Sequence, residues 1–230
     1  MKTIGLLGGM SWESTRTYYE AINQEVRARC GGLHSAKIAM YSVDFDEIER
    51  LQDAGRWDQA GRVLAEAAKR VEATGADFLL LCSNTMHSVA PEIEQAIGIP
   101  LLHIADATAE EVKGTSLHTV GLLGTKFTME LDFYRGRLVS RHGLEVLIPA
   151  ESERELIHRV IYDELCMGRL LDVSREQYVD IINKLAARGA EGIILGCTEI
   201  SLLVAPEHSP LPLFDTTTIH ARAAVDWALA

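Results

Sequence analysis

The sequence repeats itself once, and this repeat limits the folds that the chain can adopt. The segment GLLGGM at residues 5–10 returns as GLLGTK at residues 121–126. Similarly, GADFLLL at residues 75–81 returns as GAEGIIL at residues 189–195. The two pairs are separated by nearly the same length of chain, which is far too long for a solenoid repeat. The repeat therefore predicts two similar halves.

Short apolar runs recur along both halves, and most precede a stretch in which apolar residues have helical spacing. Nearly continuously apolar strands that alternate with helices are typical of parallel sheets covered on both faces. We therefore expect an α/β fold with two pseudo-symmetric α/β domains, each a mainly parallel sheet flanked by helices. The expected strands span residues 3–7, 37–42, 78–81, 101–104, 120–123, 146–148, 193–195 and 211–214.

The first domain is expected to comprise residues 1–103 plus 216–230, and the second residues 104–215. Residues 217–229 have a helical pattern that we expect to pack back onto the first half. Sheets of this type bind ligands outside the carboxyl ends of their strands. Two such halves would place an active site in the interdomain cleft.

The repeat aligns Ser83 with Cys197. Each closely follows a buried strand and opens a polar segment, SNTMH in one half and CTEI in the other. Both segments run into helical patterns, so helix N-termini should offer free N–H groups to an anion such as a substrate carboxylate. A cysteine after an apolar strand is usually a small buried hydrophobe, but the polar neighbours of Cys197 favour a functional thiol. A helix N-terminus there would lower the pKa of the thiol.

Composition removes several functional classes. Lys plus Arg number 22 and Asp plus Glu number 33, which gives a net charge of −11 and argues against a nucleic-acid partner. The chain has no apolar run long enough for a membrane span. Its four cysteines form no C-x-x-C pair and are typical of reduced thiols in a cytoplasmic protein.

The glycines and histidines predict neither a nucleotide site nor a metal site. The glycine segments lack the G-x-G-x-x-G and G-x-x-x-x-G-K-[ST] spacings, so we interpret them as tight strand-to-helix turns. The spacing of His87, His103 and His220 does not pair them as metal ligands, and we expect packed or supporting histidines.

The sequence resembles the aspartate/glutamate racemase family, and it resembles the enterobacterial members of that family closely. The resemblance is carried by the two polar motifs, by GLLGGMSWEST at residues 5–15 and by GTKFTM at residues 124–129. The resemblance covers nearly the whole chain. It implies two pseudo-symmetric α/β domains and racemisation of a small-molecule amino acid without a cofactor. It also implies a homodimer.

In most relatives, two cysteines flank the substrate Cα; one removes the α-proton and the other returns a proton to the opposite face. By position, Cys197 matches the second cysteine, whereas Ser83 stands where the first usually is. A serine hydroxyl is a much weaker acid than a thiol, so Ser83 can deliver a proton more easily than it can abstract one. We therefore expect Cys197 and Ser83 as an unequal catalytic pair.

Further contacts to the substrate are carried over from the family pattern or expected from backbone N–H groups that would stabilise an enolate-like carboxylate. Many relatives place a lysine for a distal carboxylate where this chain has Cys166, so glutamate or another side chain could replace aspartate. The substrate-binding residues are expected to be Met10, Gln52, Asn84, Thr85, Thr125, Thr198 and Glu199.

Two alternatives remain open from the sequence. Some relatives use a single cysteine of the second half to decarboxylate malonates or to isomerise maleate, and Ser83 leaves that chemistry available. A catalytically silent amino-acid-binding protein that has lost the first thiol is the second alternative.

Overall fold

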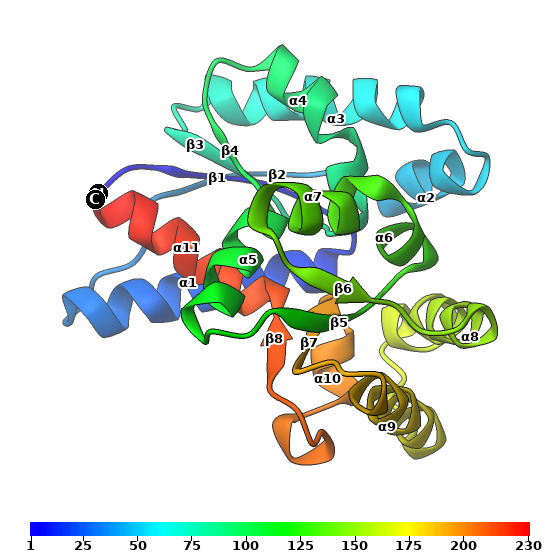
Figure 1. Cartoon of the computed structure of the whole chain (residues 1–230). Helices are drawn as coiled ribbons and strands as arrows, with labels where there is room; N and C mark the ends of the chain where they lie inside the picture. Colours follow the sequence, from blue (N-terminus) through cyan, green and yellow to red (C-terminus); the bar gives the residue numbers. More distant parts are fainter. The chain divides into compact units, whose positions relative to one another are not determined.

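The computed structural model describes residues 1–230 and contains two parallel four-stranded sheets. The chain divides into two compact units, each with one of these sheets. Unit 1 comprises Met1–Ile104 and His220–Ala230, and unit 2 comprises Ala105–Ile219. Helices flank the sheet in each unit, which confirms the predicted α/β class (Figure 1).

The sheet of unit 1 has the strand order β2-β1-β3-β4, with every neighbouring pair parallel. The two middle strands, β1 and β3, are buried along their whole length, as the continuously apolar sequence predicts. The strands are β1 (Ile4–Gly8), β2 (Ile38–Ser42), β3 (Phe78–Leu81) and β4 (Leu101–Leu102).

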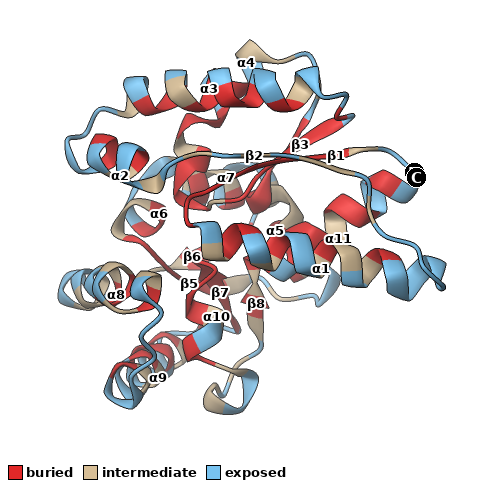
Figure 2. Ribbon diagram, turned by 180° about the vertical axis from the view of Figure 1, so that it is seen from behind, coloured by how far each residue is buried: buried red, intermediate tan, exposed pale blue.

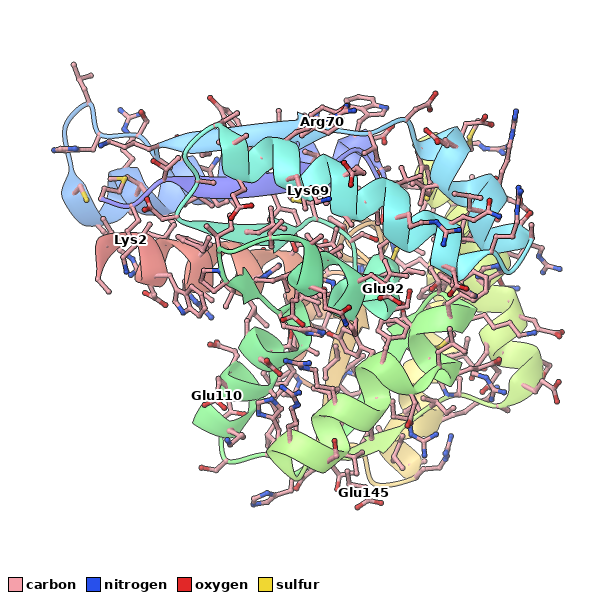
Figure 3. All side chains as sticks on the ribbon, turned by 90° about the horizontal axis from the view of Figure 1, so that it is seen from above. Lys2, Lys69, Arg70, Glu92, Glu110 and Glu145 are labelled. Carbon is pink, nitrogen blue, oxygen red and sulfur yellow. The ribbon has the colours of Figure 1, made fainter.

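Helices cover both faces of this sheet. One apolar core lies between the sheet and the group of α2, α3 and α4, and a second lies between the sheet and the pair of α1 and α11 (Figure 1). The buried residues of α3 line the side toward the strands (Figure 2), while Lys69, Arg70 and Glu92 are exposed on α3 and α4 (Figure 3). The helical elements are α1 (Trp12–Cys30), α2 (Phe45–Asp53), α3 (Trp57–Ala73), η1 (Thr85–Val89, a 3-10 helix), α4 (Ala90–Ala96) and α11 (Thr216–Leu229).

The local sequence determines where helix α1 begins and ends and which of its faces is buried. The hydroxyl of Ser11 caps its first turn by accepting a backbone N–H at 3.3 Å. Tyr18, Ile22 and Val26 follow at intervals of one turn and are buried against the sheet. Gly31 ends the helix with a φ of 73°, a conformation that suits glycine.

Unit 2 repeats the topology of unit 1, because its strand order is β6-β5-β7-β8 with every neighbouring pair parallel. The strands are β5 (Thr119–Gly124), β6 (Glu145–Leu147), β7 (Gly192–Gly196) and β8 (Leu213–Asp215). The helical elements are α5 (Ile104–Gly114), α6 (Lys126–Glu130), α7 (Asp132–His142), α8 (Glu151–Asp163), η2 (Leu165–Met167), α9 (Asp172–Ala187), α10 (Ile200–Leu203) and η3 (Pro206–His208). The equivalent strand order of the two sheets agrees with the two similar halves that the sequence repeat predicts.

Helices α5 and α7 of unit 2 are joined by ionic hydrogen bonds. Asp106 of α5 accepts two hydrogen bonds of 2.6 Å from the Arg137 guanidinium and one of 2.9 Å from His142, both on α7. Asp106 therefore has a structural role.

Among the other helices of unit 2, α8 and α9 pack against β5.

All eight expected strands are present, with small shifts at their ends. The largest differences concern β4, which stops at Leu102 because α5 begins at Ile104, and β8, which begins at Leu213. The helix expected near the end of the chain is α11, and its residues from His220 onward belong to unit 1. None of the helices is both long and apolar enough to cross a bilayer.

Candidate functional site

In unit 1, the polar segment after β3 lies at the carboxyl edge of the sheet. Strands β1 and β3 are paired up to Leu7 and Leu81, so the chain leaves both strands at the same edge. Ser83 is partly exposed there, and its Oγ accepts the backbone N–H of Met86 at 3.3 Å. The side chains of Asn84 and Thr85 are buried beside it, at the start of η1.

Two further expected site residues of unit 1 belong to the same edge. Gln52 of α2 is buried and donates from Nε2 to Sδ of Met86 at 2.8 Å, so α2 is held against η1. Met10 lies in the core cluster that also contains Met86. Gln52 thus lies beside η1, and Met10 belongs to the core that packs on the same side of the sheet.

The glycine segment after β1 is a tight turn, as expected. Gly9 has a φ of 95°, and its backbone N–H donates to Oγ1 of Thr15 at 2.8 Å. A Cβ atom at Gly9 would lie 2.2 Å from the backbone oxygen of Val43. Only glycine allows the two segments to approach this closely.

In unit 2, Thr125 and Cys197 occupy the corresponding edge. Gly124 and Gly196 are paired at the ends of β5 and β7. Thr125 and Cys197 directly follow these two strands. Thr125 caps α6 by accepting a backbone N–H at 3.2 Å. Thr198 accepts a hydrogen bond of 3.1 Å from the Thr217 hydroxyl, which follows β8.

The Cys197 side chain is buried and contacts a carboxylate. Its thiol donates to Oε2 of Glu199 at 2.9 Å, and Glu199 is itself buried. Glu199 was expected to contribute to substrate binding. The structure gives its carboxylate a different contact, as the hydrogen-bond acceptor for the thiol.

The expectation of a lowered pKa for Cys197 is wrong. Burial, followed by the charge of Glu199, raises the pKa of the Cys197 thiol well above its usual value. The helix that follows, α10, spans Ile200–Leu203 only, and the element after Ser83 is the five-residue 3-10 helix η1. Such short elements have little macrodipole to stabilise a thiolate, so Cys197 rests as a neutral thiol.

The other three cysteines lie in different parts of the chain and differ in burial. Cys82 is fully buried in the core between the sheet and the pair of α1 and α11, and burial raises the pKa of its thiol. Cys30 is exposed at the end of α1, and Cys166 is partly buried in η2. None of them forms a disulfide.

The three histidines that sequence spacing could not connect lie together in unit 1. His87, His103 and His220 are all buried, and the ring centroid of His87 lies 4.5 Å from that of His103 and 6.0 Å from that of His220. They come from η1, from the residue after β4 and from α11, so only the folded chain brings them together. The chain has no group of three or more His, Cys, Asp or Glu arranged to hold a metal ion.

The burial of His220 predicts a loss of stability in mild acid. Burial lowers the pKa of His220 to about 4, below the ordinary value of about 6.5 that applies to the unfolded chain. The unfolded chain therefore binds this proton first as the pH falls, so the penalty is absent above pH 6.5 and grows down to pH 4. Its full size is about 3 kcal/mol.

Urea unfolding at several pH values between 7 and 4 measures this loss, with His220→Gln as the control that cannot titrate. Gln keeps a donor that can reach the carbonyl of Leu102, which His220 contacts at 2.8 Å. The difference in unfolding free energy between the two proteins should shrink as the pH falls. A difference that stays constant across this range would contradict the prediction.

A sequence profile described as Asp/Glu/Hydantoin racemase matches residues 7–224. Among curated proteins, the broad specificity amino-acid racemase RacX of Bacillus subtilis is 23% identical over 99% of this chain and 98% of its own length. Among solved structures, a Yersinia pestis protein provisionally named an Asp/Glu racemase is 55% identical, with a TM-score of 0.94 and full coverage of both chains. An aspartate racemase homologue from Pyrococcus horikoshii is 35% identical, with a TM-score of 0.86 and the same coverage.

These similarities extend over both units and over the edge segments that carry Ser83 and Cys197. The resemblance seen in the sequence is therefore confirmed. With its repeated sheets and with nearly its whole length matched by one profile, this chain belongs to the Asp/Glu/Hydantoin racemase family.

Proposed function

We propose that this protein is a cofactor-independent amino-acid racemase that interconverts the L and D forms of an acidic amino acid of the aspartate/glutamate type. The observation that carries the proposal is the buried Cys197 thiol hydrogen-bonded to Glu199 at the carboxyl edge of the unit 2 sheet. A thiol there can exchange one proton with a substrate Cα, and a carboxylate beside it can accept the proton of the thiol.

Glu199 supplies the base that Cys197 needs. The thiol rests protonated because its pKa is raised, so it is ready to donate a proton to a carbanion. To abstract a proton instead, Cys197 first passes its own proton to Oε2 of Glu199 along the hydrogen bond of 2.9 Å. The same residue thus serves both directions of proton transfer.

Ser83 is proposed as the second catalytic group, acting on the opposite face of Cα. Its Oγ accepts a backbone N–H, while the carbonyl of the same residue is contacted by Nδ1 of His87 at 2.7 Å. The second nitrogen of His87 is also occupied, at 3.3 Å from the backbone N of Ile104. His87 is therefore not the base for the hydroxyl, which supports a role for Ser83 as a proton donor.

The remaining candidate residues are proposed to bind the substrate. The α-proton of an amino acid is weakly acidic, so the site must stabilise charge that develops on the carboxylate. Backbone N–H groups at Asn84, Thr85, Thr198 and Glu199 are proposed for this task. Met10, Gln52 and Thr125 are also proposed to contact the substrate.

A chiral assay across a panel of L- and D-amino acids tests the proposed function. We expect inversion of at least one acidic amino acid without added cofactor, and no inversion by the Cys197→Ala variant. Release of carbon dioxide from an arylmalonate, or isomerisation of maleate, without racemisation would favour another reaction on the same scaffold. Thermal stabilisation by an amino acid without any exchange of its α-proton would indicate a binding protein.

The pairing of a thiol with a hydroxyl predicts unequal exchange from the two enantiomers. Cys197 should abstract the α-proton readily from one enantiomer, whereas Ser83 should abstract it poorly from the other because an alkoxide is hard to form. Deuterium incorporation at Cα in heavy water, started separately from each pure enantiomer, measures the two initial rates. Equal rates would contradict the unequal pair.

We also propose that the enzyme works in the cytoplasm as a homodimer. None of its four cysteines forms a disulfide, which supports a reducing compartment. The dimer rests on the family resemblance alone. Light scattering of the purified protein during size-exclusion chromatography measures its mass in solution, and a mass of one chain would contradict the dimer.

A further inference from the structure

The histidine cluster of unit 1 touches the main chain of Ser83 directly. Nδ1 of His87 lies 2.7 Å from the Ser83 carbonyl oxygen, and Nε2 of the same ring lies 3.3 Å from the backbone N of Ile104. The ring is 1% exposed, and its contact with the backbone N of Ile104 is buried. A buried imidazole with both nitrogens engaged has a fixed position.

These two contacts determine which nitrogen of His87 carries the proton. The N–H of Ile104 can only donate, so Nε2 must be the acceptor. The carbonyl of Ser83 can only accept, so Nδ1 must carry the proton. His87 is therefore a neutral imidazole that donates to Ser83 and accepts from Ile104.

In His220 the other ring nitrogen carries the proton, and hydrogen bonds at both nitrogens hold this ring in the cluster. Its Nε2 lies 2.8 Å from the carbonyl oxygen of Leu102, so Nε2 carries the proton. Its Nδ1 then accepts the hydroxyl hydrogen of Tyr18 at 2.8 Å. The rings of His87 and His220 are thus neutral, and the His103 ring packs against that of His87.

The second anchor of His87 lies at a distinctive point of the chain. Ile104 is the last residue of unit 1 before the chain passes into unit 2, and His220 is the first residue after it returns. The His87 ring therefore connects the turn that holds Ser83 with the place where the chain leaves unit 1.

We propose that His87 is a positioning residue for the racemase reaction: by donating from Nδ1 to the Ser83 carbonyl, it holds the Ser83 hydroxyl in its catalytic orientation, anchored on Ile104. The proposal rests on the proposed function. Ser83 has no strand on either side to fix it, because β3 ends at Leu81 and η1 begins at Thr85. A displacement of about 1 Å at a reacting group can lower a rate by roughly 10²-fold.

Two variants separate the two bonds of the ring. His87→Asn places an amide nitrogen near the position of Nδ1, so it keeps the donor to Ser83 and loses the acceptor for Ile104. His87→Gln reaches the position of Nε2, so it keeps the acceptor and loses the donor. Tyr18→Phe is the matched control, because it removes a buried hydrogen bond of the same cluster without touching Ser83.

The readout is the ratio of two rates measured in heavy water: inversion at Cα, which needs both Ser83 and Cys197, and deuterium exchange with retention, which needs Cys197 alone. We expect His87→Gln to lower inversion by roughly 10- to 100-fold, with a much smaller change in exchange. His87→Asn should retain most of the wild-type ratio, and Tyr18→Phe should leave the ratio unchanged even though the protein is less stable.

An unchanged ratio in His87→Gln would overturn the proposal, because a purely structural loss lowers both rates together. The ¹⁵N resonances of His87 in the wild-type protein give an independent measurement, and a proton on Nε2 would overturn it as well. A wild-type protein that neither inverts nor exchanges any amino acid of the panel would instead refute the proposed function. The two failures are therefore distinguishable.

Discussion

Replacement of Cys197 by alanine is expected to reduce racemisation by roughly 10³-fold or more, because one group supplies a proton in one direction and removes it in the other. The variant should fold, since the thiol is a small side chain at the end of β7 and its loss leaves only the Glu199 carboxylate without that donor. Chiral chromatography of the product, together with deuterium exchange at Cα, measures the loss.

Two further variants show whether the thiol chemistry is responsible. Cys197→Ser keeps a hydroxyl of similar size beside Glu199 but is a far weaker acid, so it should retain little inversion. Cys30→Ala removes an exposed thiol at the end of α1 and should keep wild-type activity. Substantial inversion by Cys197→Ala would remove Cys197 from the mechanism.

Replacement of Gly9 by alanine is expected to destabilise the protein by about 3 kcal/mol or more. The new Cβ atom would lie 2.2 Å from the backbone oxygen of Val43 and 2.6 Å from its backbone nitrogen, and neither can move without shifting the segment after β2. The φ of 95° adds backbone strain for any residue with a Cβ. Urea unfolding monitored by circular dichroism measures the change.

Gly55→Ala is the matched control for this prediction. Gly55 also has a positive φ, of 64°, but a Cβ there would meet no atom within 4 Å. Its substitution should therefore lower the free energy of unfolding only through the backbone strain of a positive φ, by about 1 kcal/mol. If Gly9→Ala destabilised the protein no more than Gly55→Ala, the close approach to Val43 would have no energetic importance.

The sequence predicted the architecture well because the repeat carries it. Each copy of the GLL segment became the central strand β1 or β5, and each copy of the GAD/GAE segment became the turn and the strand β3 or β7. Buried parallel strands have a continuous apolar pattern that can be read from single residues. The ends of β4 and β8 were less accurate, since the following helix and loop decide where pairing stops.

The electrostatics of the candidate site could not be predicted in the same way. The sequence shows that Glu199 lies two residues after Cys197, but only the turn after β7 brings the carboxylate to the thiol. The burial of the Cys197 side chain was equally hidden, and together with the charge of Glu199 it reversed the expected direction of the thiol pKa. Likewise, the contact between Tyr18 and His220 joins residues far apart in the chain.

The nesting of unit 2 within unit 1 has a consequence for folding during synthesis. Unit 2 is one uninterrupted stretch, whereas unit 1 needs the α11 residues Ala221, Ala224 and Val225 to complete one of its two cores. While a ribosome is still translating unit 2, the corresponding sheet face of unit 1 lacks that cover and leaves apolar side chains open to aggregation or chaperones. Early folding of unit 2 would shorten the effective loop that α11 must close and so hasten the burial of that face.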